Sequence, residues 1–157
     1  MDTHLCVDVT VLDHLSLFAL NREYEALLTR LHVCDWNIEP PELWQLLQDS
    51  ASVLVCLVRG DQLVATALGS VCGFPDCRVL VDNVVTHDDY EGRGYGKQVL
   101  EELENEARRR WSHPQRHLRA ILTNRPTRGN GEFYARQGWY PLTPDTVEMT
   151  RLWQKDL

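Results

Sequence analysis

The stretch over residues 84–97 constrains the fold of this chain more than any other part of the sequence. It has the pattern of a β-strand, a glycine-rich turn and the first turn of a helix, with glycines at Gly92, Gly94 and Gly96. Glycine adopts positive φ values without strain and lets a ligand approach the backbone closely. Several backbone N–H groups then converge at the positive end of the helix dipole. The stretch therefore predicts a binding site for an anion, with phosphate the best-suited group.

The glycine spacing distinguishes this turn from two common nucleotide-binding loops. A Walker loop ends in Gly-Lys-Ser/Thr and begins with another glycine, but Glu91 stands at that first position and Gln98 follows Lys97. The dinucleotide fingerprint Gly-x-Gly-x-x-Gly also fails, because single residues separate all three glycines. The sequence thus argues against both loops.

Length and charge limit the class of protein. The chain has 157 residues, 43% of them apolar, which suffices for one domain with a buried core, and we expect a single domain over residues 1–157. The net charge of −7 argues against a nucleic-acid or anionic-membrane partner. No apolar run approaches the roughly 18 residues of a membrane span, and the N-terminal residues lack a secretion-signal pattern.

The five cysteines indicate neither a disulfide framework nor a metal site. They are odd in number and form no Cys-x-x-Cys pair. Cys72 and Cys77 flank a turn and resemble half of a zinc site, but no second pair at ligand spacing accompanies them. We therefore expect a reduced, cytoplasmic protein that binds no metal.

Hydrophobic periodicity predicts a mixed α+β fold. We expect strands over residues 5–12, 52–58, 63–70, 78–86, 117–123, 139–142 and 147–153, and helices over residues 22–31, 41–48, 96–111 and 130–137. Strands 78–86 and 117–123 should be parallel, because a helix connects them as a crossover. The expected architecture is a central, mixed, mostly antiparallel sheet of about six or seven strands flanked by about four helices.

The helix over residues 96–111 is amphipathic. Its apolar positions recur at helical spacing, and glutamates followed by arginines occupy the remaining positions. We expect these charged residues to form a solvated face, with ion pairs Glu104–Arg108 and Glu106–Arg110 at i, i+4 spacing.

Two motifs resemble those of the GNAT acetyltransferase superfamily. Residues 89–97 are similar to its acetyl-CoA pyrophosphate loop, Arg/Gln-x-x-Gly-x-Gly/Ala between a strand and a helix: Gly94 and Gly96 match, and Glu91 replaces the usual Arg or Gln. Residues 133–139 resemble the second hallmark, a Phe-Tyr pair on a short helix followed by glycine and an aromatic residue. The separation of the motifs, about one helix and one strand, also resembles the family pattern.

This resemblance implies the fold and the cofactor. It implies a GNAT-type acyl-CoA N-acyltransferase fold, with acetyl-CoA as the acyl-donor substrate and without a metal. The loop would hold the pyrophosphate, and the preceding strand would hold the thioester end. The expected acetyl-CoA-binding residues are Val84, Val85, Thr86, Glu91, Gly92, Arg93, Gly94, Tyr95, Gly96, Lys97, Asn124 and Tyr134.

Acyl transfer from a thioester to an amine needs a polarised carbonyl and a proton donor for the departing thiolate. Backbone N–H groups where the strand 78–86 separates from its parallel neighbour can polarise the carbonyl. Tyr134 is the candidate general acid, because a phenol with a pKa near 10 is protonated at neutral pH, and the resemblance implies the same role. Asn124 either bonds the pantetheine arm or an ordered water, or caps the turn before Pro126.

The amine must also lose a proton. The sequence from Asp82 to Val85 is similar to the Glu-Asp-Val-Val stretch of glucosamine-6-phosphate N-acetyltransferases. Asp82 is therefore the first candidate for contacting the amine or relaying its proton through water. His87 is a further candidate for proton transfer but lies toward the loop, where we expect a surface residue. A chain of water molecules without a strong base is the alternative.

The resulting functional hypothesis is an N-acetyltransferase that acts on a primary amine of a small molecule, by direct transfer in a ternary complex. A peptide or protein amine is the alternative acceptor. A non-catalytic acyl-CoA-binding sensor of the same fold is a third reading, favoured by Glu91 and opposed by Tyr134. The resemblance places the acceptor near the two N-terminal helices, the loop around Trp36 and the C-terminal strands. Exposed strand edges are compatible with a homodimer.

Overall fold

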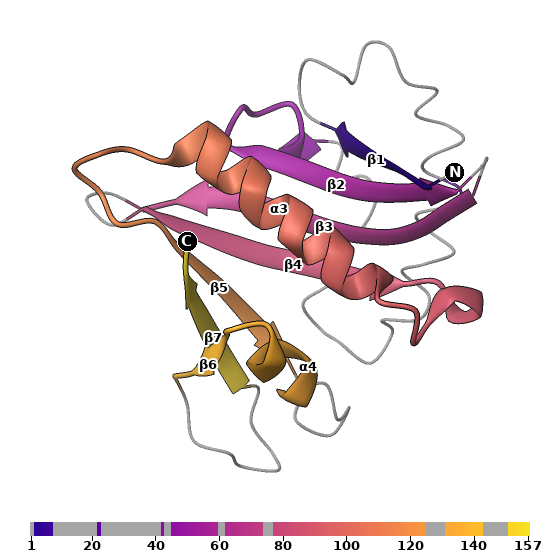
Figure 1. Cartoon of the computed structure of the whole chain (residues 1–157). Helices are drawn as coiled ribbons and strands as arrows, with labels where there is room; N and C mark the ends of the chain where they lie inside the picture. Colours follow the sequence, from indigo (N-terminus) through magenta and orange to yellow (C-terminus); the bar gives the residue numbers. More distant parts are fainter. Residues whose placement is uncertain are drawn as a thin grey trace.

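A seven-stranded mixed sheet forms the centre of the protein (Figure 1). The computed structural model describes residues 2–7, 22, 42, 45–59, 62–73, 77–124, 131–142 and 151–157. The strands are β1 (Asp2–Val7), β2 (Ser52–Arg59), β3 (Gln62–Cys72), β4 (Arg78–Thr86), β5 (Arg119–Asn124), β6 (Tyr140–Pro141) and β7 (Arg151–Asp156). The helices are the 3₁₀ helix η2 (Asp88–Tyr90), α3 (Tyr95–Trp111) and α4 (Gly131–Arg136).

The strand order across the sheet is β1-β2-β3-β4-β5-β7-β6. The pair β4–β5 is parallel, as predicted from the helical crossover between them, and the other neighbouring pairs are antiparallel. The expected mixed, mostly antiparallel α+β sheet is therefore confirmed. Strand β7 lies between β5 and β6, so the last strand of the chain is not at the sheet edge.

The strands β1 and β7 differ most from the predicted bounds, and most of the others differ by one or two residues at an end. β1 spans Asp2–Val7 instead of residues 5–12, because its pairing with β2 runs from Asp2–Arg59 to Val7–Leu54, and residues 8–12 lie outside the described part. β7 spans Arg151–Asp156 and continues past the predicted end at residue 153, because it pairs with β5 along that strand's whole length, and residues 147–150 lie outside the described part. Such shifts follow from long-range pairing, which local periodicity does not encode.

Most residues of the two helices expected in the N-terminal part of the chain lie outside the described residues. Arg22, Glu42, Gln45 and Leu46 are helical, in agreement with the helices expected over residues 22–31 and 41–48. Trp36 and the loop around it lie outside the described residues.

Helix α3 packs against the face of the sheet formed by β2, β3 and β4 (Figure 1). Val99, Leu100, Leu103 and Ala107 are fully or almost fully buried, which confirms the predicted apolar face. Gly69 of β3 allows the close approach of the helix, since a Cβ atom there would lie 2.8 Å from Leu103 Cδ1. The burial of this face removes several large apolar side chains from water, at roughly 1.5–3 kcal/mol each.

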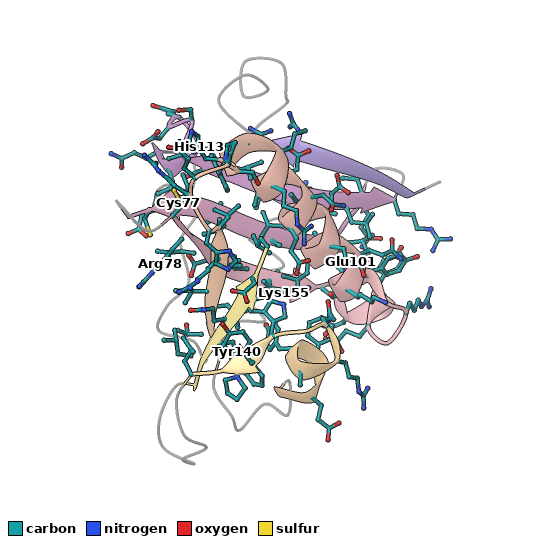
Figure 2. All side chains as sticks on the ribbon, turned by 60° about the vertical axis from the view of Figure 1, so that its left-hand side comes forward. Cys77, Arg78, Glu101, His113, Tyr140 and Lys155 are labelled. Carbon is teal, nitrogen blue, oxygen red and sulfur yellow. The ribbon has the colours of Figure 1, made fainter. Side chains whose placement is uncertain are left out.

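The expectation of a fully solvated charged face on α3 is wrong in part, because Glu104 is buried and the side chains of Glu106 and Arg110 are only 12% and 18% exposed. Glu104 is only 6% exposed, because the side chain of Lys155 of β7 lies against it and donates a hydrogen bond to its carboxylate. The predicted pairs Glu104–Arg108 and Glu106–Arg110 are both present, with N–O distances of 3.7 and 2.8 Å. Figure 2 shows Glu101 on the outer side of α3 and Lys155 between β7 and the helix.

A β-bulge in β4 sets the orientation of the residues that follow it. Val85 pairs with Thr66 but Asp82 pairs with Leu68, so that Asn83 and Val84 together face a single residue of β3. Asn83 adopts a φ of 50°, and its carbonyl oxygen accepts a hydrogen bond of 3.0 Å from Thr66 Oγ1. In a regular strand, side chains alternate between the two faces of the sheet. The extra residue of the bulge shifts this alternation by one, so each residue after the bulge faces the side opposite to the one it would face in a regular strand.

The sheet opens beyond the bulge. β4 pairs with β5 from Arg78–Arg119 to Val81–Leu122, and β4 then continues to Thr86 while β5 continues along β7. The predicted separation of the strand 78–86 from its parallel neighbour is therefore confirmed. It leaves a gap in the sheet beside the last residues of β4.

Candidate functional site

A cleft of about 580 Å³ lies at the end of β4 and brings the two sequence motifs together. We call residues 90–97, from the end of η2 to the first turn of α3, the loop wall of the cleft. We call residues 133–137, at the end of α4, the α4 wall. The lining residues are Val84, Thr86, Tyr90, Glu91, Gly92, Gly94, Tyr95, Gly96, Lys97, Phe133, Tyr134, Arg136 and Gln137. The structure thus unites side chains separated by about forty positions in sequence.

The loop wall has the backbone geometry of an anion site. Gly92 and Gly94 adopt φ values of 73° and 85°, in the left-handed region that favours glycine. Gly94 is the N-cap residue of α3, and its carbonyl oxygen accepts the backbone N–H of Gln98 at 3.0 Å. The first N–H groups of a helix have no intrahelical acceptor. The first turn of α3 contains no acidic residue, so its positive dipole end is free to bind an anion.

A glycine at position 96 is needed because of the close packing around it, and not because of its backbone conformation. A Cβ atom at this position would lie 3.3 Å from both Phe133 Cζ and Thr86 Oγ1. These two neighbours belong to α4 and β4, so Gly96 is where the first turn of α3, the end of β4 and the α4 wall come closest. A larger residue would push the two walls apart.

The guanidinium of Arg93, which we expect beside the phosphates, lies over the ring of Tyr90, 5.5 Å from the centroid. Arg59 of β2 approaches the same ring at 5.9 Å. Tyr90 lines the cleft, and its hydroxyl donates to Gln62 Oε1 at 3.1 Å. The loop wall is therefore held by stacking and by a hydrogen bond to the start of β3.

His87 was expected at the surface, but its side chain is only 25% exposed. Its Nε2 atom lies 3.1 Å from Gln62 Nε2, and its Nδ1 atom accepts the backbone N–H of Asp89 at 3.2 Å. His87 thus caps helix η2 and anchors the start of the loop wall.

The α4 wall places Tyr134 in the cleft with its ring confined by aromatic neighbours. Tyr134 is 6% exposed and packs edge-on against Phe133 and Trp139, with centroids 5.2 and 6.2 Å away. Trp153 of β7 packs against it at 6.0 Å. Helix α4 then stops at Gly138, whose φ of 87° confirms the expected C-terminal glycine. These contacts restrict the ring to one position, which a proton donor requires.

Asp82 lies on the side of the sheet opposite α3. Val81 packs in the core beneath the helix, so Asp82, the next residue of an extended strand, points to the other face. After the bulge, Val84 and Thr86 point to the α3 side and line the cleft. Burial raises the pKa of the Asp82 carboxyl above its ordinary value. Asp82 therefore lies next to the opening between β4 and β5, on the face away from the loop wall.

Asn124 is the last residue of β5, and its side chain lies outside the described part of the chain. Val85 is 7% exposed, and its strand neighbours Val84 and Thr86, not its own side chain, line the cleft.

The sequence-based site did not include four of the lining residues, Tyr90, Phe133, Arg136 and Gln137. Arg136 and Gln137 follow Phe133 at helical i, i+3 and i, i+4 spacing, so the periodicity of α4 could have identified both. Gln137 Nε2 donates to the Phe133 carbonyl oxygen at 3.1 Å, which fixes the amide orientation. No comparable pattern marks Tyr90.

Within the residues that the structure describes, no group of three or more His, Cys, Asp or Glu side chains could hold a metal ion. Cys56, Cys72 and Cys77 are free cysteines. None of the helices in the described ranges is long and apolar enough to cross a membrane.

The fold is that of acyl-CoA N-acyltransferases. An acyl-CoA N-acyltransferase from Pseudomonas aeruginosa superimposes with a TM-score of 0.72 over 99% of each chain, at 18% sequence identity. A predicted acetyltransferase from Clostridium acetobutylicum, solved with acetyl-CoA, gives a TM-score of 0.64 over 95% of this chain and 94% of the other, at 19% identity. The ribosomal-protein-S18-alanine N-acetyltransferase of Escherichia coli gives 0.70 over 99% and 94%, at 17% identity.

The sequence model of the acetyltransferase (GNAT) family matches residues 19–139. The chain belongs to this family, which makes it an acyltransferase and confirms the resemblance of the two motifs. Members of the family use acyl-CoA and act on amine acceptors. Among curated protein sequences, none is significantly similar to this chain.

Proposed function

We propose that the protein transfers an acetyl group from acetyl-CoA directly to a primary amine of a small molecule, with donor and acceptor bound together. One observation carries this proposal: a single cleft joins the left-handed glycines at the start of α3 to the phenol of Tyr134. An acyl-CoA has its functional groups in the matching order, because its pyrophosphate could bind at the glycines while its thioester lies near Tyr134.

The donor would lie along the end of β4. The N–H groups of Gly94–Lys97 and the Lys97 ammonium would hold the pyrophosphate, and Gly92 would allow it to approach the backbone. The pantetheine arm would follow Val84 to Thr86, where β4 no longer pairs with β5. Backbone groups of this segment would bind the arm and polarise the thioester carbonyl.

The chemistry is a displacement at the thioester carbon. The amine nitrogen attacks this carbon, the C–N bond forms and the C–S bond breaks. The departing CoA thiolate takes a proton from Tyr134 Oη, and the amine nitrogen loses a proton to Asp82 or to water. Tyr134 serves this step because its ring is confined at the cleft wall opposite the loop.

The position of Asp82 favours an acceptor that approaches from the face away from α3. The loop wall and α4 would enclose the donor on the α3 side, whereas Asp82, which precedes the bulge, lies on the opposite side. The opening between β4 and β5 connects the two faces. An amine entering there would meet the thioester at the opening, with Asp82 or a water molecule bound to it in reach of the amine proton.

The alternative acceptor is a peptide or protein amine. The structurally similar enzyme from Escherichia coli acts on the alanine of ribosomal protein S18, which shows that the same fold accommodates a protein substrate. A second alternative is an acyl-CoA sensor without turnover, because Glu91 lines the cleft where it would face the phosphates.

One experiment separates these possibilities. Thermal unfolding is measured with acetyl-CoA and with CoA, and thiol release is then followed over a panel of small amines and of peptides with free N-termini. Stabilisation together with thiol release on small amines supports the proposal, and release on peptides alone supports the alternative acceptor. Stabilisation without release on any amine supports the sensor, and no stabilisation by either ligand contradicts all three.

A further inference from the structure

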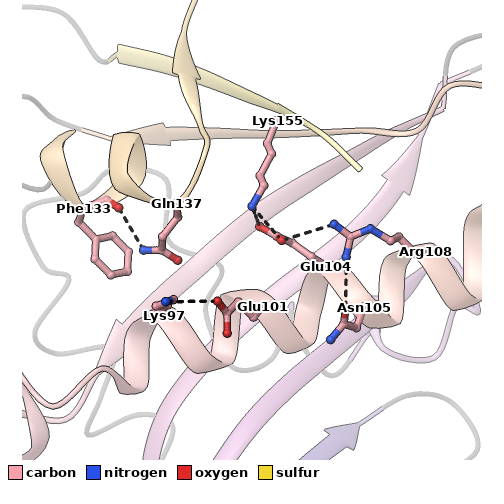
Figure 3. A network of polar contacts seen from close by, with 8 residues as sticks. All are labelled: Lys97, Glu101, Glu104, Asn105, Arg108, Phe133, Gln137 and Lys155. Atoms are coloured by element: carbon pink, nitrogen blue, oxygen red, sulfur yellow. Dashed lines mark hydrogen bonds and ion pairs between the residues drawn. The ribbon is translucent and has the colours of Figure 1, made fainter.

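A buried ion pair outside the cleft connects the two parts of the fold that form its walls. Glu104 of α3 is 6% exposed, and both of its carboxylate oxygens accept hydrogen bonds from Lys155 Nζ, at 2.9 and 3.0 Å (Figure 3). The Lys155 side chain is 19% exposed, and Arg108 lies 3.7 Å from the same carboxylate. The chemistry proposed above uses none of these groups.

The Lys155 side chain also runs along the end of α4. A Cβ atom on Gly138 would lie 3.6 Å from Lys155 Cε and 3.9 Å from its Nζ. Gly138 ends the α4 segment, and the backbone N–H of the next residue, Trp139, returns to the Tyr134 carbonyl oxygen at 3.1 Å. Lys155 therefore contacts the turn that holds Tyr134 in place before it reaches α3.

The ion pair crosses the junction of β4 and β5 where these strands are still paired, because Lys155 pairs with Ala120 of β5 and Ala120 pairs with Val79 of β4. Helix α3 packs on β2, β3 and β4, whereas Lys155 belongs to β7, which pairs with β5 and β6. The parallel pairing between these two parts runs over Arg78–Val81 of β4 and stops where the cleft begins. Figure 3 shows Lys155 reaching from β7 across to Glu104 on the helix.

We propose that Glu104 and Lys155 form a positioning pair that sets the separation of the loop wall from the α4 wall. This role rests on the proposed function, because only a ligand that contacts both walls would sense their separation. The loop wall ends in the first turn of α3, and a helix transmits the position of Glu104 to that turn rigidly, over roughly 10 Å. Lys155 fixes the other end against the turn after Tyr134.

Energetics favours a positional role over a purely stabilising one. Burying two charges costs desolvation free energy, and a well-packed apolar pair is often as stable or more so. Bidentate hydrogen bonds between charged groups, however, restrict distance and direction in a way that apolar contacts do not. The pair thus sets a defined distance between α3 and the turn after Tyr134, two segments that the pairing of β4 with β5 does not itself connect.

The test compares two ligands on the same variants. Acetyl-CoA reaches both walls, whereas 3′-phospho-ADP, its nucleotide part, reaches the loop wall alone. We expect Lys155→Met and Glu104→Gln to weaken acetyl-CoA binding about ten-fold, and 3′-phospho-ADP binding by less than about two-fold, in isothermal titration calorimetry. Arg110→Met is the matched control, because it removes the 2.8 Å contact to Glu106 within α3 alone and should leave both affinities unchanged.

The double variant Glu104→Leu with Lys155→Met separates position from stability. Replacing both partners with apolar residues avoids an unpaired buried charge, so the thermal unfolding temperature should return toward that of the wild type while acetyl-CoA binding stays weakened. A double variant that binds acetyl-CoA like the wild type would overturn the positioning role, as would single variants that weaken both ligands equally. A wild-type protein that binds neither ligand would instead refute the proposed function, and the positioning pair with it.

Discussion

The two walls of the cleft are built in different ways. The loop wall is a local structure: a strand, a turn with two left-handed glycines and a helix start follow one another within residues 84–97. The α4 wall is short, and its tyrosine is held by residues of β7 and by the turn after α4. A local wall suits a ligand group that requires only converging N–H donors, such as a phosphate. A wall that must place one hydroxyl accurately depends on contacts from distant parts of the chain.

The largest effect should come from the α4 wall. Tyr134→Phe keeps the aromatic packing but removes the hydroxyl, so we expect turnover to fall at least about ten-fold. The affinity for acetyl-CoA should change little, because the loop wall is untouched. Thiol release at saturating acetyl-CoA measures the first quantity and calorimetry the second. An unaltered kcat would show that Tyr134 is not the proton donor. The assignment of proton transfer to the α4 wall and of phosphate binding to the loop wall would then fail.

The loop wall should respond in the opposite way. Gly94→Ala places a Cβ on a residue with a φ of 85°, which costs roughly 1–2 kcal/mol and shifts the N–H groups at the helix start. We expect acetyl-CoA binding to weaken about ten-fold. Gly73→Ala is a matched control, because Gly73 has a φ of 90° at the end of β3, away from the cleft. Equal affinity losses in both variants would indicate general destabilisation.

A smaller effect is expected from charge on the loop wall. Glu91→Gln removes a carboxylate from the cleft lining near the proposed position of the pyrophosphate. The variant should therefore bind acetyl-CoA about three-fold more tightly than the wild type at low ionic strength. The difference between wild type and variant should shrink as salt is added. Titration of acetyl-CoA at two salt concentrations checks both points, and weaker binding in the variant would give Glu91 a role in holding the ligand.

The smallest effect concerns Asp82, which belongs to neither wall. Burial raises its pKa above the ordinary value of 3.8, so the folded state favours the neutral acid and ionisation near neutrality costs stability. Asp82→Asn should therefore raise the unfolding temperature at pH 7 by about 1–3 °C, and this gain should vanish as the pH falls below 3.8.

The same variant tests the proton path. If Asp82 accepts the amine proton directly or through water, thiol release should decrease even though the protein becomes more stable. Unchanged release at every pH would assign the proton to water alone.

Much of the fold could be predicted from local patterns. The bounds of β4 agree with the predicted strand over residues 78–86, and α3 begins one residue before the expected start. Both lie next to strong signals, since alternating apolar residues define the strand and Gly94 provides the N-cap of the helix. The position of β7 was less accurate, because its bounds depend on pairing with β5.

The candidate site was predictable in part for the same reason. The glycine loop is encoded by consecutive residues, and Gly92, Gly94, Gly96 and Tyr134 all line the cleft. The contact of Arg93 with the ring of Tyr90 was not predictable, because no spacing rule indicates this stacking partner for its guanidinium. Asp82 faces away from α3, and the bulge at Asn83 separates it from the cleft-lining residues of the same strand.

The sequence by itself determined the strand, turn and helix at the centre of this protein, and with them a glycine loop whose geometry suits an anion and membership of an acyltransferase family. These properties depend on neighbouring residues, whose φ values and periodicity are local. Tertiary structure alone decided that Glu104 is buried against Lys155, that β7 lies between β5 and β6, and that Tyr134 faces the glycine loop. Such features require residues far apart in the chain to meet, and their free energy appears only when the whole sheet has formed.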